Sequence, residues 1–232
     1  LLDRIFIDGL GGMAQGLFAT LIIGTIIQQI GLFMGGGTGD LIYELGKIAA
    51  GLTGAGIGVG VARKLEAGHL VIVSAAVVGM IGAFAGKILS GQVLVDGNLV
   101  LAGPGEPLGA FAAAYLAIEI GILISGKTKL DIILTPLVCI GTGSAVGLFV
   151  GPPISEFMLW LGSLINWGTE QQPFLMGIVV SVLMGMILTL PISSAALGVI
   201  LNLSGLAAGA ATIGCCCNMI GFAVASWREN KF

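Results

Sequence analysis

A few carboxylate side chains could bind a polar solute within this strongly apolar sequence. Glu119 stands inside a long apolar stretch, and Glu106 stands between Pro104-Gly105 and Pro107. An ionisable group at membrane depth is costly unless it has a partner or lines a pathway. A rigid Pro/Gly loop dipping toward the core would hold Glu106 still, and an ordinary solvated loop carboxylate is the alternative. Both carboxylates are therefore candidate ligand-binding groups.

Amide and imidazole groups form a second set of candidates. Asn202 and Asn218 stand in the last apolar segment, where they could bind the hydroxyls of a polyhydroxylated ligand or hold helices together. His69, the only histidine, begins an apolar segment after a charged stretch. It could titrate near neutral pH, or it could cap the segment at an interface. Lys87 could pair with Glu119 or extend its ammonium toward the surface.

The sequence indicates no metal, nucleotide or nucleic-acid chemistry. Cys139 and Cys215–Cys217 lie in apolar segments without chelate spacing, so no metal and no other cofactor is expected. Residues 121–128 match the P-loop spacing, but their interior is apolar, so we interpret them as a helix end followed by interfacial lysines. The net charge of −3 offers no basic face to nucleic acid. No catalytic site is predicted.

The composition requires that these residues be carried by membrane-spanning helices. Of 232 residues, 56% are hydrophobic and only 9% are charged, and the mean hydropathy is +1.09. Soluble domains carry about 25% charged residues. Strands of membrane β-barrels alternate apolar and polar residues, whereas the apolar stretches here are nearly continuous. The sequence therefore predicts an all-α, polytopic helical membrane protein.

We expect a single transmembrane domain over residues 1–232 with about seven spans. The predicted bounds are 12–33, 45–62, 70–89, 108–124, 132–150, 174–190 and 206–226, with half-helices near 155–167 and 193–203. Proline is expected to end the fifth span at Gly151-Pro152-Pro153. Asp96-Gly97-Asn98 predicts a hairpin turn. Because the chain begins without Met and stops after a charged patch, we expect it to be part of a longer protein.

Forty of the 232 residues are glycine, and this abundance indicates helices that pack closely. Pairs such as Gly12/Gly16 and Gly54/Gly58 have the small-xxx-small spacing that lets backbones approach in a membrane. The Gly-dense tracts 51–60, 141–151 and 205–214 could instead form broken or re-entrant helices that face a substrate at mid-membrane. Internal repeats are a further feature that such folds can contain.

The distribution of Lys and Arg predicts a cytoplasmic N-terminus. Arg63-Lys64 follow the second span, Lys127 and Lys129 follow the fourth, and loops 35–44, 91–106 and 151–173 contain neither residue type. The side of the C-terminus stays open, because one crossing after the sixth span would place Arg228 outside.

Three stretches resemble one group of bacterial membrane proteins. They are Gly103–Pro107, Gly126–Val138, and Cys215–Phe222 with Trp227–Asn230. With them the chain is similar, over all its 232 residues, to the phosphotransferase-system (PTS) enzyme IIC-like proteins of the second class, in the subgroup labelled toxin regulators. The resemblance implies a sugar permease of the bacterial cytoplasmic (inner) membrane that acts with separate cytoplasmic phosphoryl-carrier subunits. By analogy with sugar permeases, it also implies a homodimer.

The resemblance also bears on the candidate residues. Better-known sugar permeases pair a glutamate in a Gly-Ile-Thr-Glu-Pro loop with a histidine near the sugar, and Gly105-Glu106-Pro107 is similar to the end of that loop. The predicted substrate-binding residues are Glu106, Glu119, His69, Asn202 and Asn218. Two alternatives stay open: an ion- or proton-coupled transporter or channel in which Glu119 titrates, and a membrane-embedded sensor that binds a ligand without moving it.

Overall fold

A computed structural model describes residues 4–95, 98–101, 103–127, 129–169, 172–187 and 205–229. The fold is an all-α polytopic membrane protein, as the composition predicted. Among the described residues, five helices are long and apolar enough to span a membrane, or six if one bent pair counts as a single span. The five are Ile7–Met34, His69–Leu89, Pro107–Ile124, Asp131–Phe157 and Gly205–Arg228. Two compact units divide the chain, Leu1–Ser155 and Glu156–Phe232, and each is described by itself.

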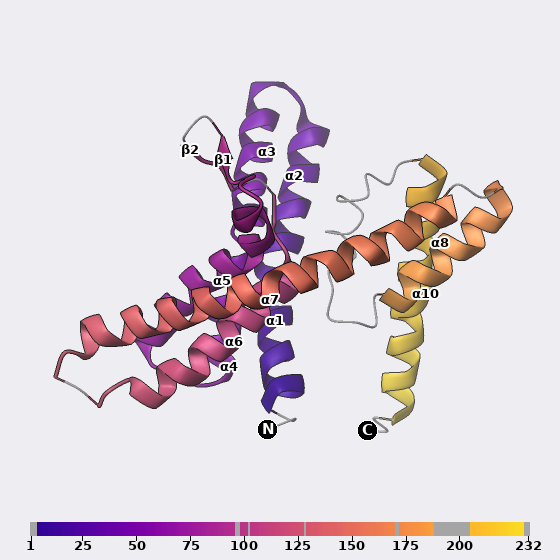
Figure 1. The fold of residues 1–232 in the computed structure, drawn as a ribbon. Helices are drawn as coiled ribbons and strands as arrows, with labels where there is room; N and C mark the ends of the chain where they lie inside the picture. The colour runs from indigo at the N-terminus through magenta and orange to yellow at the C-terminus, as the bar shows by residue number, and fades with distance from the viewer. Residues whose placement is uncertain are drawn as a thin grey trace. The chain divides into compact units, whose positions relative to one another are not determined.

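The first unit opens with a helical hairpin (Figure 1). Its first arm consists of η1 (Arg4–Gly9), α1 (Leu10–Leu17), η2 (Phe18–Ile22) and α2 (Ile23–Met34), where η marks π-helical turns. Gly35, whose φ of 62° suits glycine, turns the chain into α3 (Gly36–Gly51). The sequence pattern predicted a loop over 35–44 and a helix only from residue 45. The structure differs because two consecutive glycines with positive φ, Gly35 and Gly36, are enough for the turn.

The second arm is broken where α4 (Thr53–Lys64) follows α3. The two helices bend by 50° at Leu52, and the Thr53 hydroxyl donates to the Ala50 carbonyl at 2.6 Å. The Gly-dense tract 51–60 therefore lies at a helix break. The tracts 141–151 and 205–214 lie inside continuous helices instead.

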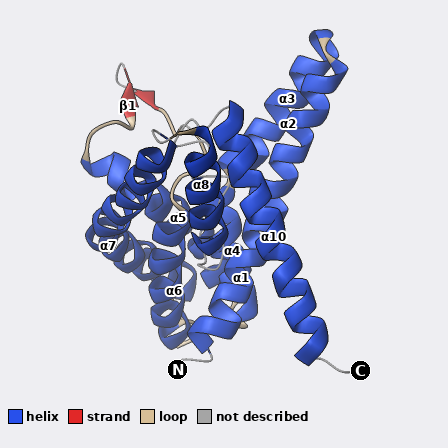
Figure 2. Cartoon of the chain, turned by 90° about the vertical axis from the view of Figure 1, so that its right-hand side faces the viewer, coloured by secondary structure: helices blue, strands red, loops and turns tan. Residues whose placement is uncertain are grey.

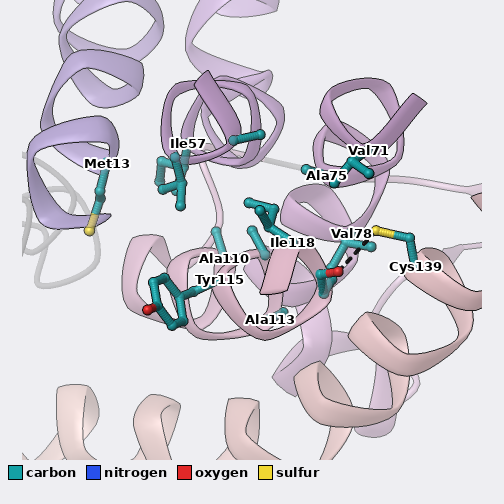
Figure 3. Packing of buried hydrophobic residues seen from close by; sticks show 14 of the residues in the cluster. Met13, Ile57, Val71, Ala75, Val78, Ala110, Ala113, Tyr115, Ile118 and Cys139 are labelled. Carbon is teal, nitrogen blue, oxygen red and sulfur yellow. Dashed lines mark hydrogen bonds between the residues drawn. The ribbon is translucent and has the colours of Figure 1, made fainter. Parts of the chain in front are cut away.

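Backbone contact joins α1, α4, α5 (His69–Leu89) and α6 (Pro107–Ile124) into the core of this unit. A Cβ on Gly12 would lie 2.6 Å from the Gly60 carbonyl oxygen, and one on Gly54 would lie 2.6 Å from that of Gly79. Such closeness supplies the van der Waals attraction that replaces hydrophobic burial in lipid. Small and branched side chains fill the remaining space, among them Ile57, Val71 and Ile118 (Figure 3).

A short hairpin follows α5, and it provides the only strands among the described residues (Figure 2). Leu94 in β1 (Leu94–Val95) pairs with Leu99 in β2 (Asn98–Leu99), and Val95 pairs with Asn98. This antiparallel register confirms the hairpin predicted around residues 96–98.

One long helix, α7 (Asp131–Thr169), continues through Pro136, Pro152 and Pro153. The prediction that Pro152-Pro153 end a span at residue 150 is wrong, and the half-helix expected near 155–167 is the end of this same helix. At Pro152 the clash of a proline with the Cβ of the preceding residue does not arise, because that residue is Gly151. Membrane helices also tolerate the lost backbone hydrogen bonds. The first part of α7 packs on α5 and α6, since a Cβ on Gly143 would lie 2.5 Å from a Val78 methyl and 2.7 Å from the Ala117 Cβ.

The second unit pairs α8 (Pro173–Ile187) with α10 (Gly205–Glu229) (Figure 1). Gly214 of α10 lies directly against the backbone of Ser181 in α8. The half-helix expected near 193–203 and residues 188–190 of the expected sixth span lie outside the described residues.

Candidate substrate-binding site

The loop that precedes α6 is fixed on the surface of α5. Gly103 and Gly105 both take positive φ, 85° and 71°, and Pro107 then begins α6. The Glu106 amide donates a hydrogen bond of 2.7 Å to the Ala83 carbonyl of α5. A Cβ on Gly105 would lie 2.7 Å from the Ala83 Cβ. The Pro/Gly loop therefore positions Glu106 against α5, which is one of the two alternatives that the sequence left open.

The Glu106 side chain caps the N-terminus of α6. One of its carboxylate oxygens accepts from the Leu108 amide at 3.4 Å, and the residue is half-buried. Burial raises the pKa of Glu106 from 4.5 to about 7, against the lowering effect of the Leu108 hydrogen bond. A carboxyl group with this pKa is populated in both protonation states near neutral pH. It can therefore donate a hydrogen bond to a hydroxyl group or accept one from it.

The break between α3 and α4 meets the same turn of α5. Gly54, in the first turn of α4, faces Ala83, and a Cβ placed on it would lie 2.9 Å from the Ala83 Cβ. The Glu106 loop contacts Ala83 as well. The N-termini of α4 and α6 thus converge on one level of α5, each with partly positive backbone amides. Thr53, which sequence reasoning did not single out, is fully buried at this break.

Glu119 belongs to a different part of α6. Thirteen residues separate it from Glu106, or about 20 Å along a helix axis. Its carboxylate forms an ion pair with the Arg4 guanidinium, with Nε and Oε1 2.8 Å apart. Tyr115 lies one turn earlier on the same face, beneath Phe111. The sequence signal for this partner was Arg4 itself, one cation ahead of the first apolar stretch, whereas sequence reasoning considered Lys87.

Lys87, the partner considered for Glu119, lies at the other end of the α5 and α6 pair. Gly82 contacts Gly109 and Gly121 contacts Val71, so the two helices run antiparallel. This arrangement puts Lys87 level with the Glu106 loop and puts Glu119 near the start of α5. The Lys87 ammonium lies 5.5 Å from the centroid of the Phe84 ring, close enough for a cation–π interaction.

His69 is the first residue of α5 and is exposed. Fourteen residues separate it from Ala83, about 21 Å along the helix, so the structure does not bring it to Glu106. The neighbouring Gly68 lies near the Ser125 hydroxyl, 3.3 Å from where its Cβ would be. His69 therefore sits at the end of the unit where the α4–α5 and α6–α7 turns meet.

Both asparagines belong to the second unit, Glu156–Phe232. Asn218 lies in α10, in the second unit, and its side-chain nitrogen is buried with no hydrogen-bond partner among the described residues. Asn202 lies outside the described residues. Within the described part of the chain, no three His, Cys, Asp or Glu residues gather as metal ligands would. Cys139 is buried and donates to the Ala117 carbonyl at 3.2 Å, which is a packing role (Figure 3).

The relationship to known proteins is found at the level of the family. The family profile described as "Phosphotransferase system, EIIC" matches residues 7–232. No curated protein and no solved structure shows a significant match.

Proposed function

The chain belongs to the phosphotransferase system EIIC family, and on that premise we propose that it binds a sugar beside Glu106 and carries it across the bacterial cytoplasmic membrane. The family implies a PTS permease subunit, a sugar substrate and phosphoryl-carrier partner subunits in general. The assignment to the toxin-regulator subgroup and the homodimeric state are proposals that rest on sequence resemblance.

The observation that carries this proposal is the placement of Glu106. Its amide is bonded to α5, its carboxylate caps α6, and the α3–α4 break lies on the same turn of α5. Broken helices whose N-termini face a common point are typical of substrate sites in transporters. A carboxyl group with a pKa of about 7 can exchange hydrogen bonds with sugar hydroxyls in either protonation state.

The proposal is tested by ligand-dependent thermal stabilisation of the purified protein in detergent. We expect a sugar or sugar acid to raise the unfolding midpoint in proportion to the logarithm of its concentration, because it binds only the folded state. Glu106→Gln should weaken that binding by about tenfold or more, the effect of losing one hydrogen bond to a charged group.

Glu44→Gln provides the matched control. Glu44 is exposed on α3 and pairs with Lys47 at 3.6 Å, away from the α6 loop, so this variant should bind the sugar as the wild type does. Equal affinity of the wild type and Glu106→Gln for every sugar that binds would contradict the placement of the site.

The ion-coupled alternative predicts a different outcome of the same assay. The structure gives Glu119 a cationic partner in Arg4, so a transported cation would have to compete with the Arg4 guanidinium for this carboxylate. Stabilisation by an ion alone, abolished in Glu119→Gln, would favour the ion-coupled transporter. Sugar binding without uptake in vesicles that contain the phosphoryl-carrier subunits would favour the sensor.

A further inference from the structure

A groove runs between α8 and α10 in the second unit. Its volume is about 300 Å³, the lower end of the range of ligand pockets, and it is largely open to its surroundings. Gly185 and Gly214 bring the backbones of α8 and α10 close together here, and Ser181, Cys217 and Asn218 supply polar or polarizable atoms. Val182 and Met186 complete the described lining, in which no side chain is charged.

Asn218 leaves an unsatisfied donor in this groove. Its Nδ2 atom is buried and has no hydrogen-bond partner in the described part of the chain, although the residue lines the groove. A buried amide without a partner destabilises the fold. Neither α8 nor α10 supplies an acceptor for this amide, so an acceptor would have to come from outside these two helices.

The depth of Asn218 restricts what that acceptor can be. The residue is thirteen positions from the start of α10 at Gly205 and eleven from its end at Glu229, so it lies near the middle of the span. Acyl chains at that depth offer no hydrogen-bond acceptor. A solute that carries hydroxyl or carbonyl oxygens does, as does the water that would accompany it.

We infer that the α8–α10 groove is a water-accessible site for a small, uncharged, hydroxylated solute, which accepts a hydrogen bond from Asn218. The uncharged character of the described lining residues favours a neutral hydroxylated group over an ion. The ligand class rests on the proposed sugar-permease function, whereas the hydration of the groove does not.

Neighbouring cysteines allow a direct test. Cys217 lines the groove, while Cys216, exposed and one position away at the same depth, is not among its lining residues. Two variants would be prepared in membranes. One keeps Cys217 and has Cys215 and Cys216 replaced by alanine, and the other keeps Cys216 and has Cys215 and Cys217 replaced by alanine. Buried Cys139 stays in both. The reagent 2-sulfonatoethyl methanethiosulfonate is anionic and does not partition into lipid, so it reaches only those cysteines that water also reaches.

We expect the Cys217 variant to be labelled at least tenfold faster than the Cys216 variant. D-glucose, D-mannitol or D-gluconamide should slow this labelling, and Asn218→Leu should abolish the slowing. Glu44→Gln, an exposed position in the other unit, should leave both the labelling of Cys217 and its slowing by the solutes unchanged.

Two results would overturn the inference. Equal labelling of the two cysteines would show that the groove is not water-accessible, whatever the Glu106 assay shows. Fast labelling of Cys217 that none of the three solutes slows would overturn the assignment of a hydroxylated ligand, even if Glu106 proves to bind sugar.

Discussion

Glu106 differs from Glu119 in how its charge is balanced. Glu119 has a guanidinium 2.8 Å away, whereas Glu106 has the Leu108 amide and the positive end of α6. Because the Arg4 and Glu119 side chains are 43% and 32% exposed, solvent screens their ion pair to about 1 kcal/mol or less. The ion pair joins the N-terminal turn to α6. Glu106, in contrast, is a carboxyl group whose protonation changes near neutral pH.

Glu106 should therefore give folding stability a measurable pH dependence. Its folded pKa of about 7 lies above the ordinary 4.5, so its contribution is fully present below pH 4.5 and is lost as the pH rises through 7. The loss should be about 1–3 kcal/mol for this half-buried group. Thermal unfolding from pH 4.5 to 8 measures it in the wild type and in Glu106→Gln.

The wild type should lose stability relative to Glu106→Gln across that interval and then level off. Glu44→Gln, which removes an exposed carboxylate, should follow the wild type. Parallel curves for the wild type and Glu106→Gln would mean that Glu106 is solvated in the folded state.

At the scale of elements, two glycines of the loop before α6 allow the effect of backbone strain to be distinguished from the effect of packing. Gly103 and Gly105 share a positive φ, so alanine at either should cost about 1 kcal/mol. A Cβ on Gly103 meets nothing within 4 Å, whereas one on Gly105 would lie 2.7 Å from the Ala83 Cβ and 2.9 Å from its carbonyl oxygen. Gly105→Ala should lower the unfolding midpoint further and weaken sugar binding at least tenfold, whereas Gly103→Ala should leave binding intact. Equal effects in the thermal-shift assay would contradict the contact.

Local sequence patterns predicted those elements whose ends are determined by neighbouring residues in the sequence. The 96–98 hairpin turn, the helix from residue 70 and the helix from residue 108 all follow from turn residues and apolar runs, and the structure has β1–β2, α5 and α6 there. The same rules failed at Pro152-Pro153, because proline penalties measured in water do not carry over to a membrane helix.

Contacts between distant segments were beyond those rules. Arg4 and Glu119 are 115 residues apart in the sequence, and although each stands out as a charge beside or within an apolar stretch, the sequence pattern does not pair them. The loop character of Glu106 was predictable from its prolines and glycines. The contact of the Glu106 loop with Ala83 and its closeness to the α3–α4 break depend on how α4, α5 and α6 pack.

At the scale of the molecule, the first unit gathers its basic turns at one end. Gly68 in the α4–α5 turn lies near Ser125 in the α6–α7 turn, so Arg63, Lys64, Lys127 and Lys129 share one side, and all four are exposed. Positive charge is retained on the cytoplasmic side of bacterial membranes. We therefore expect trypsin to cut after Lys127 or Lys129 in inside-out vesicles and to spare both sites in right-side-out vesicles, as read by mass spectrometry. Lys47, within α3, should resist trypsin in both preparations, because a helical backbone does not fit a protease site.

Cleavage of the α6–α7 turn from the outside would invert the orientation. It would then place the Glu106 loop, at the opposite end of α6, on the cytoplasmic side, where the sugar would leave the protein and not where it enters.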